Sequence, residues 1–449
     1  MKKPLFLIFF LLGLYSAIAQ NYYMPTPEGF GAAATGAGTP TVSNTVTVDT
    51  YAKLKTALTS TATANAVILI SGTIDCVYTS VLLTNRTIIG LPGAKLRNTQ
   101  ITVGNSATSA ANSGILYIKS GSNNVIIRNL VFEGPGAYDV DGRDNLTNEG
   151  TNIWVDHCEF QDGMDGNFDN KGDADNVTIS WCKFTYLKAP IPGGSGGSND
   201  HRFTDLVGSA SDDFNLNDGH YSITFQNCYW ADGCKERMPR ARNAELHILN
   251  CYYNTSVSGS LAIGLGGGNK NTTCYVENSN FAKIGSVYQT YSSDGGTISV
   301  KFDGCLGRAD SGVTAKPSYT YTVMPVANVA TYVADASCGA GATLTVSSTG
   351  VISTACPNLA VENFAANSNI KLYPTPVDTV LNIDLSNTTG GDIIVNIYSI
   401  SGAKVYSFSK KNASAKETVS VNLAGLTKGI YLCDLKIGDT TAKSKFIKK

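Results

Sequence analysis

The sequence has little charge and little that would hold it to nucleic acid or a membrane. Only 15% of the 449 residues are Asp, Glu, Lys or Arg, and the net charge is −1. That balance gives no support for nucleic-acid binding. After the first 19 residues no apolar run is long enough to span a bilayer. A local concentration of charge therefore needs a specific reason.

The first 19 residues have the pattern of a signal peptide. Lys2 and Lys3 precede an apolar run over residues 4–15, and Ala17-Ile18-Ala19 is a small-residue ending. We therefore expect a protein that is exported, through the periplasm, to the cell surface or the medium, with its mature chain starting at Gln20. We expect it to be a monomer.

What the chain has in abundance is glycine, with 45 residues, and many Thr, Ser, Asn and Val. This composition favours a β-rich chain with room for one large domain and a smaller one.

Five of the eleven cysteines fall into a repeat. Aligning strand-like runs such as IWVDHCEFQD and VTISWCKFTY gives one column, spaced by 28, 24, 46, 23, 28 and 26 residues: Leu130, Cys158, Cys182, Cys228, Cys251, Ser279 and Cys305. A period in the twenties is typical of a solenoid coil, and 46 residues fit two coils or one coil with a long insertion. We expect the column to point inward, with its cysteines packed as reduced thiols. Cys338 and Cys356 lie outside it and are the better disulfide candidates.

The flanks of the repeat carry weaker signals. Residues 51–59 predict a short helix that caps the first coil, since an open solenoid end exposes its core. Short strands are expected at 67–74, 87–90 and 115–119. Residues 309–351 alternate weakly, and we expect them to cover the far end of the solenoid.

The last eighty residues differ from the rest. After a linker at 356–369, residues 370–449 show alternating strands and a basic end, which predicts a small β-sandwich. The opening Tyr373-Pro-Thr-Pro376, the run Gly429-Ile-Tyr431 and the ending Lys445-Phe-Ile-Lys448 resemble the C-terminal sorting domains of the type IX secretion system, although Thr375 stands where those domains usually have Asn. That resemblance implies a secretion machinery as partner. A carbohydrate-binding module is the alternative, although no row of exposed aromatic residues is evident.

One stretch concentrates positive charge. Arg237, Arg240 and Arg242 surround Pro239, which removes a backbone donor and disfavours helix for Met238. We therefore expect an extended backbone that holds the arginines in a defined geometry, and fixed guanidinium forks suit carboxylate recognition. A solvated basic edge is the alternative.

A second stretch concentrates carboxylates. Asp139, Asp141 and Asp144 precede a coil that contains Asp162, Asp165 and Asp169. Oxygen donors without nearby thiolate or His pairs favour calcium over zinc, although Asp-Gly is also a common turn dipeptide. On a straight strand Asp165 and Asp169 would be about 13 Å apart, so Gly166 must let the chain bend if both are to reach one ion.

Together these runs resemble the pectate lyases of polysaccharide lyase family 1 over residues 25–330. The motifs that carry the resemblance are Asn124-Val-Ile-Ile-Arg-Asn-Leu130, Ile153-Trp-Val-Asp-His-Cys158, Asp165-Gly-Asn-Phe-Asp169, Asn176-Val-Thr-Ile-Ser-Trp181, Lys188, Leu206-Val-Gly208 and Arg237-Met-Pro-Arg-Ala-Arg242. The resemblance implies an all-β chain: a right-handed parallel β-helix over residues 20–355, followed here by the β-sandwich.

The resemblance also implies a reaction, the calcium-dependent β-elimination of polygalacturonate to 4,5-unsaturated oligogalacturonides. It assigns Asp144, Asp165 and Asp169 to Ca²⁺, Arg237 to the base, and Lys188, Arg240 and Arg242 to substrate. An arginine base is unusual because a guanidinium ordinarily stays charged.

The chain departs from the family pattern at three places. Thiols fill a column where asparagine is frequent, residues 189–200 form an insertion, and Asn170 replaces a hydrophobic residue.

Other functions fit parts of the pattern. A non-catalytic β-helix that binds polysaccharide would share the repeat but would not need the cations beside an acidic cluster. A polygalacturonase would hydrolyse with paired carboxylates, for which Asp212 and Asp213 are faint support. A pectin lyase acting on methylated substrate would not need the calcium carboxylates Asp165 and Asp169.

Overall fold

The computed structural model describes residues 22–61, 64–100, 112–140, 142–353, 371–385, 390–399, 404–437 and 440–449. The predicted signal peptide, the predicted linker and Asp141 lie outside these residues. The chain forms two compact units, Gln20–Pro357 and a unit that includes Asn358–Lys449. Each is described by itself.

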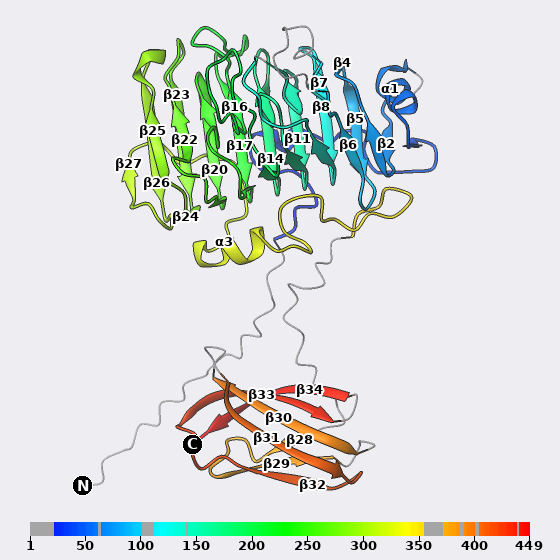
Figure 1. Cartoon of the computed structure of the whole chain (residues 1–449), viewed down its shortest axis with the longest axis vertical. Coiled ribbons are helices and arrows are strands. Elements are labelled where there is room, and N and C mark those ends of the chain that lie inside the picture. Colours follow the sequence, from blue (N-terminus) through cyan, green and yellow to red (C-terminus); the bar gives the residue numbers. More distant parts are fainter. Residues whose placement is uncertain are drawn as a thin grey trace, which may run out of the picture. The chain divides into compact units, whose positions relative to one another are not determined.

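The larger unit is a parallel β-solenoid of about nine turns (Figure 1). Sheet A contains β1 (Thr45–Val48), β2 (Val67–Ile70), β5 (Thr84–Gly90), β8 (Asn123–Arg128), β11 (Thr151–Asp156), β14 (Asp175–Ser180), β17 (Tyr221–Gln226), β20 (Ala244–Leu249), β23 (Thr272–Glu277), β26 (Ile298–Asp303) and the antiparallel edge strand β27 (Ser311–Gly312).

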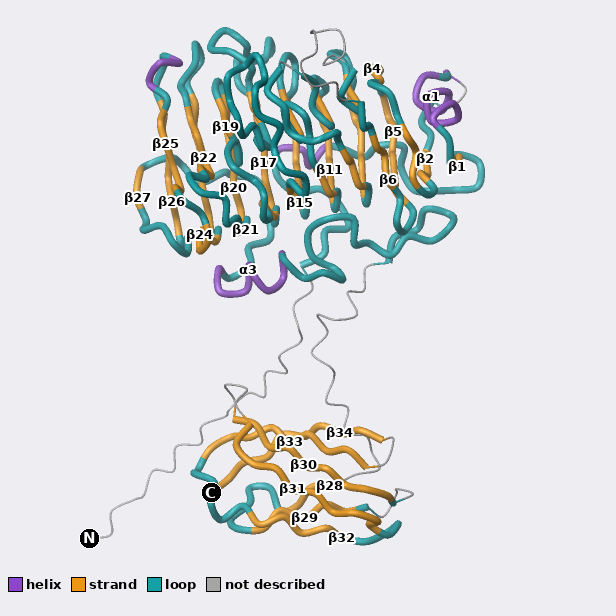
Figure 2. Tube along the Cα trace, in the orientation of Figure 1, coloured by secondary structure: helices purple, strands orange, loops and turns teal. Residues whose placement is uncertain are grey.

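Two further sheets complete each coil (Figure 2). Sheet B contains β3 (Thr73–Asp75), β6 (Lys95–Arg97), β9 (Val131–Glu133), β12 (Glu159–Gln161), β15 (Lys183–Thr185), β18 (Tyr229–Trp230), β21 (Tyr252–Asn254) and β24 (Asn280–Lys283). Sheet C contains β4 (Thr79–Val81), β7 (Leu116–Ile118), β10 (Leu146–Asn148), β13 (Phe168–Asn170), β16 (Leu206–Val207), β19 (Arg240–Ala241), β22 (Leu261–Leu265) and β25 (Ser286–Thr290).

The corner between sheets A and B explains the repeat. Asn129, Asn227 and Asn250 end their sheet A strands in the left-handed region, with φ of 56°, 57° and 53°, a conformation that asparagine tolerates better than most residues. The next residue in each coil belongs to the predicted column and points into the core. Cys158, Cys182, Cys228 and Cys251 are each 0% exposed, so the prediction of an inward column is confirmed. The 46-residue interval is one coil with long insertions. Between the sheet A strands β14 and β17 the chain forms only one strand of sheet B, β15, and one strand of sheet C, β16.

The column thiols are free and bonded to the backbone. Cys182 Sγ lies 3.6 Å from Val155 O, and Cys251 Sγ lies 3.5 Å from Phe225 O, each reaching back to the preceding coil. Cys338 is disulfide-bonded, and Cys356, its predicted partner, lies outside the described residues.

An aromatic stack runs beside the thiols in sheet B. The ring centroids of successive members are 4.5–5.4 Å apart. The stack consists of Phe132, Phe160, Phe184, Trp230, Tyr253 and Phe281. Because each ring packs on that of the neighbouring coil, it fixes the vertical register of the coils.

Helix α1 (Tyr51–Thr59) lies where the sequence predicts it. Thr50 caps it by accepting from Lys53 N at 3.4 Å, and Leu54, Ala57 and Leu58 are buried in the solenoid core. The helix thus closes the first coil.

The segment after the last coil takes a different path from the predicted one. We expected residues 309–351 to cover the far end. Only β27 pairs with the last strand there, and the residues after it run back along the outer face of sheet A, through α3 (Val326–Val333), to pack Leu344 and Val346 on Val67 and Leu69. The outer face of sheet A carries Trp154 and Trp181, which the segment buries together with Met324 and Val329. That apolar surface explains the route.

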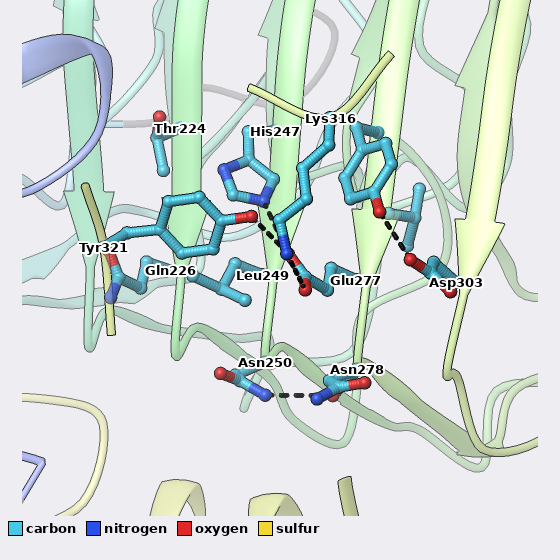
Figure 3. Close-up of polar contacts among 12 residues, drawn as sticks. Thr224, Gln226, His247, Leu249, Asn250, Glu277, Asn278, Asp303, Lys316 and Tyr321 are labelled. Carbon is cyan, nitrogen blue, oxygen red and sulfur yellow. Dashed lines mark hydrogen bonds and ion pairs between the residues drawn. The ribbon is translucent and has the colours of Figure 1, made fainter. Parts of the chain in front are cut away.

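Glu277 fastens this segment, which we call the strap (residues 313–353), to β23. Its carboxylate accepts from Lys316 Nζ at 2.7 Å and from Tyr321 Oη at 2.6 Å, and lies 3.6 Å from His247 Nε2 (Figure 3). Glu28 holds the next residues, accepting from Thr322 N and from Gln226 Nε2.

The described part of the unit also contains the 3₁₀ helices η1 (Phe30–Ala33) and η3 (Ser292–Asp294). Among the described residues no helix has both the length and the hydrophobicity needed to cross a membrane.

The smaller unit is the predicted β-sandwich. One antiparallel sheet contains β28 (Lys371–Tyr373), β29 (Val380–Asp384) and β32 (Thr418–Asn422), and the other β31 (Lys404–Ala413), β30 (Gly391–Ser399), β33 (Gly429–Ile437) and β34 (Thr440–Lys448). Leu381, Val395, Val421 and Leu435 are among the residues that fill the core between them.

Candidate functional site

The predicted carboxylates come together on the outer face of sheet C. Asp144 lies two residues before β10, Asp165 lies three residues before β13, and Asp169 is the central residue of β13. The parallel pairing of Leu146 with Phe168 aligns these positions on neighbouring coils. The fold therefore joins residues that the sequence separates by 25 positions.

Gly166 provides the space in which two of these carboxylates meet. A Cβ placed on Gly166 would lie 2.8 Å from Asp144 Oδ1 and 2.9 Å from Asp169 Oδ1. Any side chain here would collide with both oxygens. Glycine is thus needed at this position because the two carboxylates approach its backbone closely.

These carboxylates are buried and repel one another. Burial raises the pKa of Asp144, with Asp165 adding to the shift and Lys171 opposing it. Burial and then the charge of Asp144 hold the pKa of Asp169 well above its usual range. Thr147 donates to Asp144 Oδ2 at 2.6 Å, whereas Asp144 Oδ1 is buried with no hydrogen-bond partner in the described structure.

Asp165 is held differently, by the residue that directly follows the insertion. His201 Nε2 lies 2.9 Å from Asp165 Oδ1, and His201 Nδ1 lies 3.4 Å from Asp139 Oδ1. Burial opposes ionisation of Asp165, but the bond from His201 and the charge of Arg237 place its pKa below the ordinary value. Ser198 N donates to Asp139 at 2.7 Å, which fastens the insertion to the loop before β10.

The donors of this cluster fit a hard cation in their chemistry. Asp144 offers an unpartnered buried oxygen, and Asp169 offers an oxygen facing the same space beside Gly166. All are carboxylate oxygens, which suit calcium. Within the described residues no three His, Cys, Asp or Glu side chains are already arranged to hold a metal ion, so the fit lies in the donor set and not in a finished coordination sphere.

Arg237 lies next to the acidic cluster. Its guanidinium lies 4.9 Å from the centre of the Phe203 ring, and its carbonyl accepts from Thr204 Oγ1 and, at 2.7 Å, from Asp205 N. We expected an extended backbone around Pro239, and Arg240–Ala241 forms β19. Arg237 instead has φ of 58°, a left-handed conformation that costs free energy in a residue with a Cβ.

Arg240 and Arg242 share one carboxylate. Asp294, in η3, accepts from Arg240 Nη2 and, at 2.9 Å, from Arg242 Nε, while Arg240 lies 3.7 Å from the centre of the Tyr291 ring. Burial and the neighbouring Arg242 lower the pKa of Arg240, despite its bond to Asp294. With Arg237 and Phe203 these residues line a cleft of ≈ 380 Å³.

Lys188 lies apart from this cleft. Its ammonium donates to Gly134 O at 2.7 Å and lies 3.7 Å from Glu133 and 3.9 Å from Asp162. Asp162, which the sequence placed among the metal candidates, accepts from Leu187 N and Lys188 N. Its contacts thus orient the chain at Lys188.

The bonds of Asp213, one of the two carboxylates considered for a hydrolase, give it a structural role. Asp213 accepts from Ser209 N and Ser209 Oγ, both at 2.7 Å, and from Gly172 N at 3.2 Å. These bonds close the turn after β16, so Asp213 has a structural role there.

Four residues of the site were not predicted. His201 and Phe203 follow the predicted insertion at 189–200, and no local pattern marks either residue. Tyr291 and Asp294 come from the coil after the arginine stretch and have no local signal. His201 and Phe203 also contact each other, with ring centroids 4.1 Å apart.

Comparison with known families gives two matches. The family model described as "Pectate lyase" matches residues 13–369, and the model described as "Secretion system C-terminal sorting domain" matches residues 371–449.

Individual relatives cover less of the chain. It is 34% identical over 217 residues to a "Pectate trisaccharide-lyase" of Thermotoga maritima, covering 45% of this chain and 50% of the relative. It is 30% identical over 231 residues to a "Pectate lyase" of Bacillus subtilis, covering 43% and 48%. The chain thus spans about half the length of the curated relatives it matches.

Solved structures share the fold. A mutant of Bacillus subtilis pectate lyase superposes with a TM-score of 0.52 at 23% identity, covering 72% of this chain and 98% of that one. A structure titled "Pectate lyase bound to hexasaccharide" gives 0.51 at 22% identity, covering 73% and 99%. At such identities the likeness establishes the β-helix alone.

Proposed function

Because the chain belongs to the pectate lyase family, we propose that its solenoid cleaves α-1,4-linked polygalacturonate by β-elimination, with Ca²⁺ as cofactor. The observation that carries the proposal is the juxtaposition of Asp144, Asp165 and Asp169 with Arg237 on the outer face of sheet C. Charges of both signs at one place suit a substrate that is an anion and must lose a proton.

The reaction removes H5 of a uronate and expels the oxygen at C4, which leaves a C4–C5 double bond. Negative charge builds beside a carboxylate that is already charged, so that group must be neutralised first. Ca²⁺, when bound by Asp144, Asp165 and Asp169, supplies this neutralisation as a Lewis acid.

The residues of the chain would divide the remaining work. Arg237, in its neutral guanidine form, would take the H5 proton and become a guanidinium, and its stacking on Phe203 restricts the side chain before substrate arrives. Arg242 and Arg240 bind substrate carboxylates, with Asp294 holding their forks in place. Lys188, which lies among Glu133, Gly134 and Asp162, would contact a sugar farther along the chain.

The domain boundaries support a division of roles. We propose that residues 20–355 form the catalytic domain, that 356–369 form a linker, and that 370–449 direct export by the type IX secretion system after passage through the periplasm. Residues 1–19 would be the signal peptide, and the secreted protein would act as a monomer.

Growth of ultraviolet absorbance from unsaturated product on polygalacturonate, with and without a calcium chelator, tests the proposal. We expect absorbance to grow, to stop with chelator and to return with added Ca²⁺. Reducing ends formed without the absorbance would indicate hydrolysis and overturn it. Faster growth on methylated pectin that is insensitive to chelator would identify a pectin lyase.

A further inference from the structure

A second cationic site lies beside the carboxylates, on the side away from Arg237. Its centre is Arg143, the residue before Asp144, whose guanidinium lies 5.4 Å from the centre of the Tyr78 ring. The Tyr78 and Tyr117 rings meet edge to face at 6.2 Å. All three side chains are half-buried.

Arg143 differs from the other cations near the cleft in its lack of a counter-charge. Arg240 and Arg242 are bound to Asp294, and Lys188 lies near Glu133 and Asp162. In the part of the chain that the structure describes, Arg143 has no carboxylate within ion-pair distance. The nearby positive charge of Lys171 repels it, whereas Lys171 is itself stabilised by Asp144 and Asp169. An anion bound at Arg143 would relieve that repulsion.

The backbone is shaped to hold Arg143 in this position. Ser113 Oγ accepts from Arg143 N at 3.1 Å. A Cβ on Gly114 would lie 2.6 Å from Arg143 Cβ and 3.2 Å from Tyr78 Cδ2, so only glycine lets the arginine lie against the tyrosine. A freely solvated arginine would need neither feature.

Tyr117 places the cluster in line with the proposed active site. In sheet C, Tyr117 pairs with Thr147, and Thr147 pairs with Asp169. Their side chains thus form one outward row, and at strand spacing Tyr117 lies about 10 Å from Asp169. A polysaccharide crossing the coils over Asp169 and Thr147 would then reach Tyr117.

We propose that Arg143, Tyr78 and Tyr117 form a distal subsite for a uronate residue of the substrate. The planar fork of Arg143 binds the sugar carboxylate, and the two tyrosine rings provide an apolar surface for the sugar ring, while the Tyr117 hydroxyl stays bonded to Glu149. The inference rests on the proposed function. The subsite adds one claim to that function: long, unesterified substrate chains make a contact with Arg143 that short chains cannot reach.

The test compares Arg143→Gln with Arg97→Gln, an arginine on sheet B that is paired with Asp75 outside the proposed site. The substrates are unesterified oligogalacturonates of increasing length and their methyl esters. Initial rates give kcat and KM. Binding by calorimetry in the full chain carrying Arg237→Ala gives Kd without turnover.

We expect Arg143→Gln to raise KM and Kd for long unesterified chains about tenfold, with kcat within about twofold of wild type. The shortest cleaved oligomer should be unaffected, methyl esters should bind wild type and variant alike, and Arg97→Gln should change nothing. Arg143→Lys should recover part of the loss, because charge returns without the fork.

Equal losses on all chain lengths, or none on any, would overturn the subsite. Should Arg143→Gln not fold, Tyr78→Leu removes the contact that positions the guanidinium and should reproduce the length-dependent loss. A wild type that binds long chains tightly but yields no unsaturated product would refute the proposed reaction and leave the binding comparison valid.

Discussion

Arg237 is the residue on which the proposed chemistry depends. Its left-handed backbone and its stacking on Phe203 place one guanidinium beside three carboxylates. Arg237→Ala should reduce the lyase rate by 10²–10⁴-fold or more, because a proton-transfer group typically contributes about that much. Calcium affinity should stay the same or rise slightly, since a positive charge leaves the neighbourhood of the carboxylates. Steady-state rates across alkaline pH and calcium titration of the same variant check this.

Arg237→Lys is the matched control. A lysine retains the charge but lacks the planar fork, so it should recover little activity. An Arg237→Ala chain that keeps more than about a tenth of the wild-type rate would place the base elsewhere, and Lys188 would be the next residue to test.

Asp169 should lower the stability of the calcium-free protein, because its carboxylate is buried beside another carboxylate before any cation binds. It is 4% exposed, and burial beside Asp144 disfavours its ionised form. Asp169→Asn should therefore raise the melting temperature in calcium-free buffer at neutral pH, by an amount equivalent to about 1–3 kcal/mol. The variant should lose the further stabilisation that wild type gains from Ca²⁺ and should be inactive at ordinary calcium levels.

Thermal unfolding with and without Ca²⁺ measures both effects. Asn170→Asp, at the next position of the same strand but pointing inward, is a contrasting variant. It should destabilise the chain whether or not Ca²⁺ is present. An Asp169→Asn chain that Ca²⁺ stabilises as much as wild type would remove Asp169 from the proposed ligands.

The strap is the element whose stability should depend on acid pH. Glu277 is 6% exposed, and although burial alone would raise its pKa, bonds from His247, Lys316 and Tyr321 lower it from 4.5 to about 2. A depressed carboxyl pKa contributes stability that is complete above the unfolded value and is lost as pH falls toward the folded value. We expect this loss between about pH 4.5 and 2.

Glu277→Gln should lower the free energy of unfolding at pH 7 by about 1–3 kcal/mol. The difference from wild type should be constant between pH 8 and 6.5 and should nearly vanish by about pH 2. Burial also lowers the pKa of the neighbouring His247, so wild type starts to lose stability as pH falls below the ordinary value of that histidine. Denaturant unfolding across this range is the measurement, and a pH-independent difference would contradict the account.

At the scale of the whole molecule, the two units should be separable. The solenoid has its own core of thiols, aromatic rings and aliphatic residues, and the sandwich has another. A chain ending at Pro357 should fold, retain Cys356 and keep wild-type kcat and KM within about twofold. In cells it should accumulate without export. A truncated chain that is well folded and inactive would contradict the sorting role of residues 370–449.

The sequence by itself determined the repeat and the fold class, and it indicated the two charged stretches of the candidate site. A solenoid coil buries its side chains only against its neighbours, so the Cys158–Cys182–Cys228–Cys251 column had to recur once in each coil and could be recognised without a structure. The acidic stretch and the arginine stretch could be recognised because each is local.

Only the tertiary structure decided which distant residues complete the site. Asp294 and Tyr291 reach Arg240 because the coils stack, and His201 reaches Asp165 because residues 189–205 fold back along the sheet. Coil stacking also places Lys188 among Glu133, Gly134 and Asp162, none of which is its neighbour in the sequence. The strap follows the outer face of sheet A because Trp154 and Trp181 expose apolar surface there, and periodicity within the strap could not reveal a surface formed by other coils. Contacts between coils are fixed by stacking register, which a local pattern does not encode.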